Sequence, residues 1–171
     1  MTFLLAFGCK SDSKKDQGSF SDCKYGQPEA VFAPDLPGVK AHRFEQKPKA
    51  AIENISLENG IDLQLTQSGC NEAIQEFRFQ LPKTMLAQIS GDSIDLSQPA
   101  FWISMAQAQF AALGTLGEKY MSFGFWAQAI EEKKPSMNLG EPVELQPGFT
   151  AKVDKIDGSE HTLLLVTLSG G

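Results

Sequence analysis

Apolar and polar side chains alternate between residues 49 and 82, and this pattern limits the possible folds more than any other feature of the chain. Every second residue is apolar in three short runs, as expected for β-strands with one buried face. Polar residues, among them Glu53, Asp62, Gln64, Glu76 and Arg78, mostly lie between the apolar ones and are expected on the solvent side. The pattern predicts three antiparallel strands, with buried Ile55, Leu57, Ile61, Leu63, Leu65, Phe77, Phe79 and Leu81.

The turn between the first two of these strands can be deduced from the parity of the pattern. A two-residue loop at Asn59 and Gly60 would pair Leu57 with Asp62 and place the two apolar rows on opposite faces. A three-residue loop pairs Leu57 with Ile61, so that both rows are buried together. We therefore predict a type I turn with Gly60 in the left-handed conformation, closing a G1 bulge.

Length and charge restrict the class of protein. The 171 residues are enough for one domain with a substantial core, which we place at residues 20–171. The net charge of −6 argues against a nucleic-acid partner. Beyond the first eight residues, no apolar run approaches the roughly 18 residues that a membrane-spanning helix needs.

The N-terminus changes abruptly from apolar to polar. Residues 3–7 are apolar, Gly8 and Cys9 follow, and residues 10–19 contain no apolar side chain. This arrangement resembles a bacterial lipoprotein signal, in which a small residue precedes a cysteine that is lipidated and becomes the new N-terminus. The resemblance implies a signal-like segment at 1–8, lipidation of Cys9, a flexible tether at 9–19 and a membrane anchor in the cell envelope. The alternative is an ordinary first strand or frayed terminus with a free cysteine.

The lipoprotein resemblance also bears on the other two cysteines. An envelope location is oxidising, so Cys23 and Cys70 can form a disulfide while Cys9 carries the lipid. The alternative is a pair of buried thiols in a cytosolic protein.

Residues 20–48, called here the lead-in segment, contain four prolines, which makes continuous regular structure improbable. Residues 38–45 could form an edge strand of the sheet. We expect His42 and Arg43 to be a surface pair on that strand.

Ser68 and Gly69 begin the turn that joins the second and third core strands. They resemble the loop of the periplasmic and membrane-bound lysozyme inhibitors, which insert Ser-Gly, followed by a tyrosine two residues later, into the lysozyme cleft. Asn71 and Glu72 stand where that tyrosine would be sought. The resemblance implies that Ser68 and Gly69 belong to a binding surface.

Two helical patterns follow the strands. Ser97 is a suitable N-cap for a helix over about 98–113, with Pro99 in its first turn. Gly114 and Gly117 end that pattern, and a second helix is expected to end before Pro135. Its start is ambiguous, because residues 120–126 also alternate like a strand.

Aromatic side chains are concentrated in this helical region. Trp102, Tyr120 and Trp126 could line a groove for a small apolar ligand or a protein partner. The alternative is that the two helices only cover one face of the sheet, as an α+β domain requires.

The C-terminal residues predict a hairpin. Phe149, Ala151 and Val153 match Leu164, Val166 and Leu168 in parity across a loop at Asp157 and Gly158, or a longer one through Glu160. Leu163 and Leu165 point the other way, which suits a central strand. The expected fold is α+β, an antiparallel sheet of an N-terminal meander and a C-terminal hairpin under a central helical pair.

Motifs for catalysis or cofactor binding are absent from the sequence. It contains no nucleophile elbow, phosphate loop or zinc spacing. Asp154, Asp157 and Glu160 lack the spacing of a calcium loop and are interpreted as a solvated turn. We therefore expect no cofactor or metal. Together with the lipoprotein resemblance, this indicates a lipid-anchored envelope protein that acts as a non-enzymatic binding or inhibitory module. The alternatives are a small envelope hydrolase or transferase, or a protein similar to the lysozyme inhibitors.

Overall fold

The structure, a computed structural model, describes residues 23–90 and 95–171. The signal-like segment at 1–8, Cys9 and the tether at 9–19 lie outside the described residues. No helix of the described part is long and apolar enough to cross a membrane.

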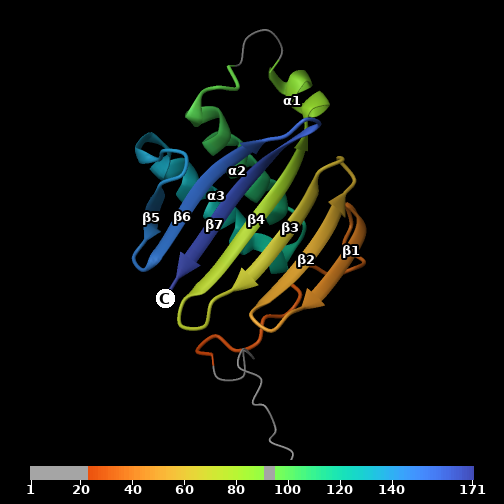
Figure 1. The fold of residues 1–171 in the computed structure, drawn as a ribbon, viewed down its shortest axis with the longest axis vertical. Coiled ribbons are helices and arrows are strands. Elements are labelled where there is room, and N and C mark those ends of the chain that lie inside the picture. The colour runs from red at the N-terminus through yellow and green to blue at the C-terminus, as the bar shows by residue number, and fades with distance from the viewer. Residues whose placement is uncertain (1–22, 91–94) are drawn as a thin grey trace, which may run out of the picture.

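The described residues form a seven-stranded antiparallel sheet with helices on one face, which confirms the expected α+β class (Figure 1). The strand order is β1-β2-β3-β4-β7-β6-β5. The first four strands form the expected meander, and β5 adds a third strand to the expected C-terminal hairpin. The strands are β1 Val39–Gln46, β2 Ala50–Leu57, β3 Asp62–Ser68, β4 Ala73–Pro82, β5 Pro142–Gln146, β6 Phe149–Asp157 and β7 His161–Gly170.

The register of β2 and β3 confirms the predicted turn. The Leu57 backbone N–H donates to the Ile61 carbonyl at 2.9 Å, and Ile55 pairs with Leu63. Gly60 has φ of +85°, the left-handed conformation that the three-residue loop demands. Ile55, Ile61, Leu63 and Leu65 consequently face the helices and are buried, and Leu57 at the end of β2 is partly buried against the same core.

The helices lie in the connection between β4 and β5. They are α1 Lys83–Ser90, α2 Pro99–Gly114 and α3 Met121–Lys133, with short 3₁₀ turns η2 Glu118–Tyr120 and η3 Lys134–Ser136. Figure 1 shows α2 and α3 side by side behind the sheet. They pack closely where Gly114 meets Gly124, since a Cβ on Gly114 would lie 2.7 Å from the Gly124 nitrogen. A close backbone approach thus explains the glycine at the last position of α2.

The start of α2 differs from the prediction. Gln98, and not Ser97, occupies the N-cap position, and its side chain makes no capping bond. The reason lies in Asp95, whose carboxylate accepts bonds from the Ser97 backbone N–H at 2.8 Å and the Gln98 side chain at 2.9 Å. Ser97 is therefore part of the turn that precedes the helix. Helix α1 was not predicted, because its eight residues carry no clear start signal.

The β6–β7 hairpin is confirmed, but its turn lies further along the chain than predicted. Asp157 pairs with Thr162, and the Gly158 N–H donates to the His161 carbonyl, which leaves Ser159 and Glu160 as the loop. This register has the same parity as the predicted ones, so the buried rows are unchanged. Strand β7 is central, and Leu163 and Leu165 are half-buried on the open face.

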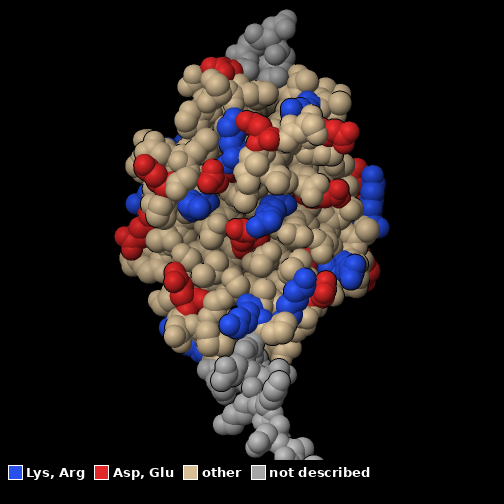
Figure 2. Space-filling model, viewed as in Figure 1, with Lys and Arg blue, Asp and Glu red and all other residues tan. Residues whose placement is uncertain are grey.

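The sheet face opposite the helices carries mixed charges. Figure 2 shows lysine, arginine and acidic groups interspersed over it, without a large area of one sign. On this face Arg78 Nε lies 2.6 Å from Glu76 Oε1, two residues earlier on the same strand. This face therefore lacks the concentrated positive charge that nucleic acid would need.

Candidate functional site

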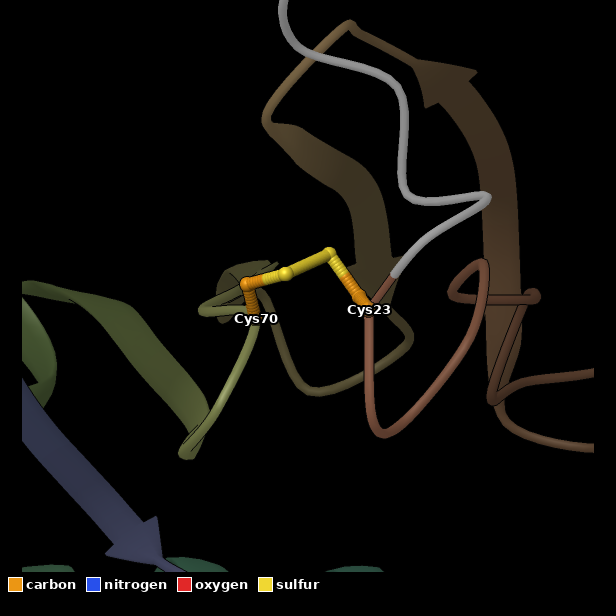
Figure 3. Close-up of a disulfide and its surroundings, with 2 residues drawn as sticks. All are labelled: Cys23 and Cys70. Atoms are coloured by element: carbon orange, nitrogen blue, oxygen red, sulfur yellow. A yellow bond between two sulfur atoms is a disulfide. The ribbon is translucent and has the colours of Figure 1, made fainter.

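The predicted disulfide is present and joins the lead-in segment to the β3–β4 turn. Figure 3 shows Cys23 and Cys70 linked by a disulfide. Their Cα atoms are 4.5 Å apart. The Lys24 N–H also donates to the Cys70 carbonyl at 3.0 Å. Ser68 ends β3 beside this link, and a Cβ on Gly69 would collide with the Glu72 carbonyl. The turn requires glycine for packing, and its role in binding stays a prediction.

Glu53 is the most unusual polar residue of the domain, and its predicted place on the solvent side is wrong. It has the same parity as Ile55, faces the helix side of the sheet and is 0 % exposed. Its two carboxylate oxygens accept the backbone N–H groups of Val31 and Phe32, each at 2.9 Å. A buried carboxylate needs such partners, and here they come from the lead-in segment that folds over β2.

His42 is a third hydrogen-bond partner of Glu53. The prediction that His42 is a surface residue paired with Arg43 is therefore wrong. Its Nε2 lies 2.6 Å from Glu53 Oε1, and its side chain is only 9 % exposed. Arg43 points to the other face of β1 and contacts Glu45 at 3.8 Å. Neighbouring residues of a strand point to opposite faces, which separates His42 from Arg43.

Tyr120 fixes the same segment from the helix side. Its hydroxyl accepts the Ala33 N–H at 3.0 Å, and its ring stacks on Phe32 with centroids 5.6 Å apart. Phe32 also stacks on Phe123 of α3. Tyr120 is 4 % exposed, so it holds the lead-in segment in place and is not part of the molecular surface.

The two tryptophans lie near opposite ends of β6. Trp102 lies under the Lys155 ammonium, 5.0 Å from the ring centroid, whereas Trp126 packs on Phe149 at 5.6 Å. Lys155 and Phe149 are six positions apart along one strand, which corresponds to about 20 Å. The structure therefore does not bring Trp102, Tyr120 and Trp126 together into one groove.

Trp102 borders a cavity of about 460 Å³ between α1, the start of α2 and the β6–β7 hairpin, called here the Trp102 cavity. Its buried floor consists of Leu86, Trp102 and Thr162. The indole N–H of Trp102 donates to the Leu96 carbonyl at 2.8 Å, so the ring presents its apolar face without an unpaired polar atom. The lining residues are Lys83, Leu86, Ala87, Leu96, Ser97, Trp102, Lys155, Asp157 and Thr162.

Polar groups of the Trp102 cavity lie on the hairpin side. Lys155 Nζ donates to Asp157 Oδ2 at 3.2 Å, and the Thr162 hydroxyl donates to Asp157 Oδ1 at 3.3 Å. Lys83, at the first position of α1, is exposed and has no carboxylate within 4.0 Å among the described residues. Sequence reasoning did not find Lys83 or Lys155, since only the tertiary structure places them beside Trp102.

Neither a cluster of metal-binding side chains among the described residues nor a known relative identifies the site. Within residues 23–90 and 95–171, no group of three or more His, Cys, Asp or Glu side chains could hold a metal ion. The chain matches no family model, no curated protein and no solved structure. The geometry of the Trp102 cavity is therefore the basis on which function has to be argued.

Proposed function

We propose that this chain is a lipid-anchored protein of the bacterial cell envelope that acts as a non-enzymatic binding module and takes a small apolar ligand in the Trp102 cavity. The observation that carries the proposal is the cavity itself. A volume of about 460 Å³ lies within the range of small-molecule sites, and its buried floor is formed by Trp102, Leu86 and Thr162. Such sites bind an apolar body by burial and orient it by a few polar groups at the rim.

The disulfide supports the location. A Cys23–Cys70 bridge is stable in an oxidising compartment such as the periplasm or cell surface. The chain has three cysteines, so this bridge leaves Cys9, the residue that the N-terminal pattern marks for lipidation.

A fractionation experiment tests the anchor. Wild-type protein should partition with membranes and carry lipid on an N-terminal Cys9, while Cys9→Ser should be released or remain unprocessed. Equal partitioning of both proteins, with Met1 retained in each, would refute lipidation.

Ligand binding is tested separately by the fluorescence of Trp102. Trp126→Phe leaves Trp102 as the sole tryptophan, because the chain contains two. Dodecanol added to this variant should change the Trp102 emission in a saturable way. A Leu86→Phe variant, which enlarges a side chain of the cavity floor and adds no tryptophan, should abolish that change without loss of the folded state as judged by circular dichroism. Linear, non-saturable quenching by dodecanol in the unfilled protein would contradict binding in the cavity.

A further inference from the structure

The Trp102 cavity is chemically two-sided, and this asymmetry bears on the kind of ligand it takes. Leu86 and Trp102 are almost fully buried and form an apolar floor, with Leu96 beside them. Lys83 and Lys155 line the same cavity from two different elements, α1 and β6. A ligand in this cavity would therefore contact apolar side chains on its floor and two ammonium groups at its rim.

Lys155 is held in position but retains donor capacity. Its Nζ lies 5.0 Å from the Trp102 ring centroid and 3.2 Å from Asp157 Oδ2. An ammonium group has three N–H donors, and Asp157 accepts one of them. Asp157 has a side chain that is 61 % exposed, so water screens its attraction for Lys155. Lys155 can therefore donate to a second anion without losing its place above the indole.

Lys83 supplies the second positive charge. Among the described residues it has no ion-pair partner, and its side chain is exposed beside the cavity. Two ammonium groups and one carboxylate leave one net positive charge at this rim, on a chain whose net charge is −6. An anion is therefore attracted to this rim more than to the protein as a whole.

We infer that the ligand of the Trp102 cavity is an amphipathic anion, with an acid group between Lys83 and Lys155 and an apolar body against Trp102 and Leu86. This inference rests on the proposed binding function and adds the chemical class of the ligand. A neutral apolar ligand would displace water from the ammonium groups without replacing its hydrogen bonds, which is costly. A cationic amphiphile would be repelled by both lysines.

Three probes with the same apolar chain test the inference: dodecanoate, dodecanol and dodecyltrimethylammonium. They are titrated into the full-length chain carrying Cys9→Ser and Trp126→Phe, with Trp102 emission as the signal, the two ionic probes below their micelle concentrations and dodecanol below its solubility limit. Dodecanoate should bind about tenfold or more tightly than dodecanol, since one charge-assisted hydrogen bond contributes about that factor. Dodecyltrimethylammonium should bind most weakly.

Lysine variants locate the acid group. Lys83→Met and Lys155→Met should each reduce dodecanoate affinity about tenfold and leave dodecanol affinity unchanged. Lys152→Met is the matched control, because Lys152 lies on the same strand but faces the opposite side of the sheet. It should change neither affinity.

The outcomes separate the two proposals. Equal affinities for dodecanoate and dodecanol, or dodecanoate binding that neither Lys83→Met nor Lys155→Met weakens, would overturn the anionic class while binding in the cavity stands. Failure of all three probes to give saturable binding would overturn the binding function itself.

Discussion

Replacing Glu53 by glutamine is expected to destabilise the domain far more than any surface substitution, because the carboxylate lies at the centre of the lead-in attachment. Glutamine has nearly the same shape but only one acceptor oxygen. If that oxygen keeps the bonds to Phe32 and His42, the new NH₂ group faces the Val31 N–H donor. One bond is lost, two donors confront each other in a fully buried site, and the remaining bonds lose their ionic character.

The size of the effect follows from these contacts. A hydrogen bond to a charged group contributes about 1.5–3 kcal/mol, and charge-assisted bonds are roughly twice as strong as neutral ones. Loss of one such bond and weakening of the others should lower the free energy of unfolding by about 3 kcal/mol. For a domain of this size, that corresponds to a decrease in Tm of about 6–12 °C.

Thermal and urea unfolding of Glu53→Gln, followed by circular dichroism, provide the measurement. Glu76→Gln is the matched control, because Glu76 lies on the open face of β4 and pairs with Arg78. An exposed pair contributes about 1 kcal/mol at most, so the control should change Tm by only a few degrees. If the two variants unfold together, Glu53 is not the attachment point that its contacts indicate.

The remaining predictions concern backbone packing and one titrating group. Gly114→Ala should cost about 1–3 kcal/mol, because its Cβ would meet the Gly124 backbone at 2.7 Å and overpack the helix crossing. Gly124→Ala meets no atom within 4 Å and should be neutral or stabilise α3 by up to about 1 kcal/mol; equal effects of the two in urea unfolding would contradict the close helix approach. Gly60→Ala should cost about 1 kcal/mol or more through its positive φ, and an unchanged Tm would count against the G1 bulge. Hydrogen bonds from Ser97 and Gln98 lower the pKa of Asp95 to about 2. Because this pKa is depressed in the folded state, the stabilisation is present above pH 3.8 and is lost as the pH falls through about 2. An NMR titration of the Asp95 carboxyl carbon should give that midpoint, and a midpoint near 3.8 would mean that the turn does not form.

The strands and their register could be predicted because side-chain parity admits few solutions. A shift of one residue would turn every apolar side chain of β2 or β3 from the core to solvent, so only the three-residue turn at Gly60 was acceptable. The helices α2 and α3 followed from periodicity, although the α2 N-cap did not. Asp95 forms a local turn whose bonds compete with the cap predicted at Ser97, and local patterns alone do not rank the two.

The candidate site was only partly predictable, because its residues come from elements far apart in the chain. The sequence predicts Trp102 as a candidate binding residue, but the two lysines beside it come from α1 and β6, and no sequence spacing relates them to the tryptophan. Trp126 and Tyr120 were grouped with Trp102 by composition. The structure separates all three residues. Trp126 packs near the end of β6 that is far from Trp102, and Tyr120 lies under the lead-in segment.

Taken by itself, the amino-acid sequence determined which residues form β2, β3, β4, β6 and β7, which face of the sheet is buried, where the β2–β3 turn lies and which two cysteines can pair. These properties depend on local periodicity, on turn geometry and, for the cysteines, on the oxidising compartment that the lipoprotein resemblance predicts. Only the tertiary structure decided that β4 pairs with β7, and that Glu53 lies inside the core. A glutamate in a strand pattern is assigned to solvent, because burying a carboxylate without partners is too costly. Its partners, two backbone N–H groups and His42, come together only when the lead-in segment folds over β2.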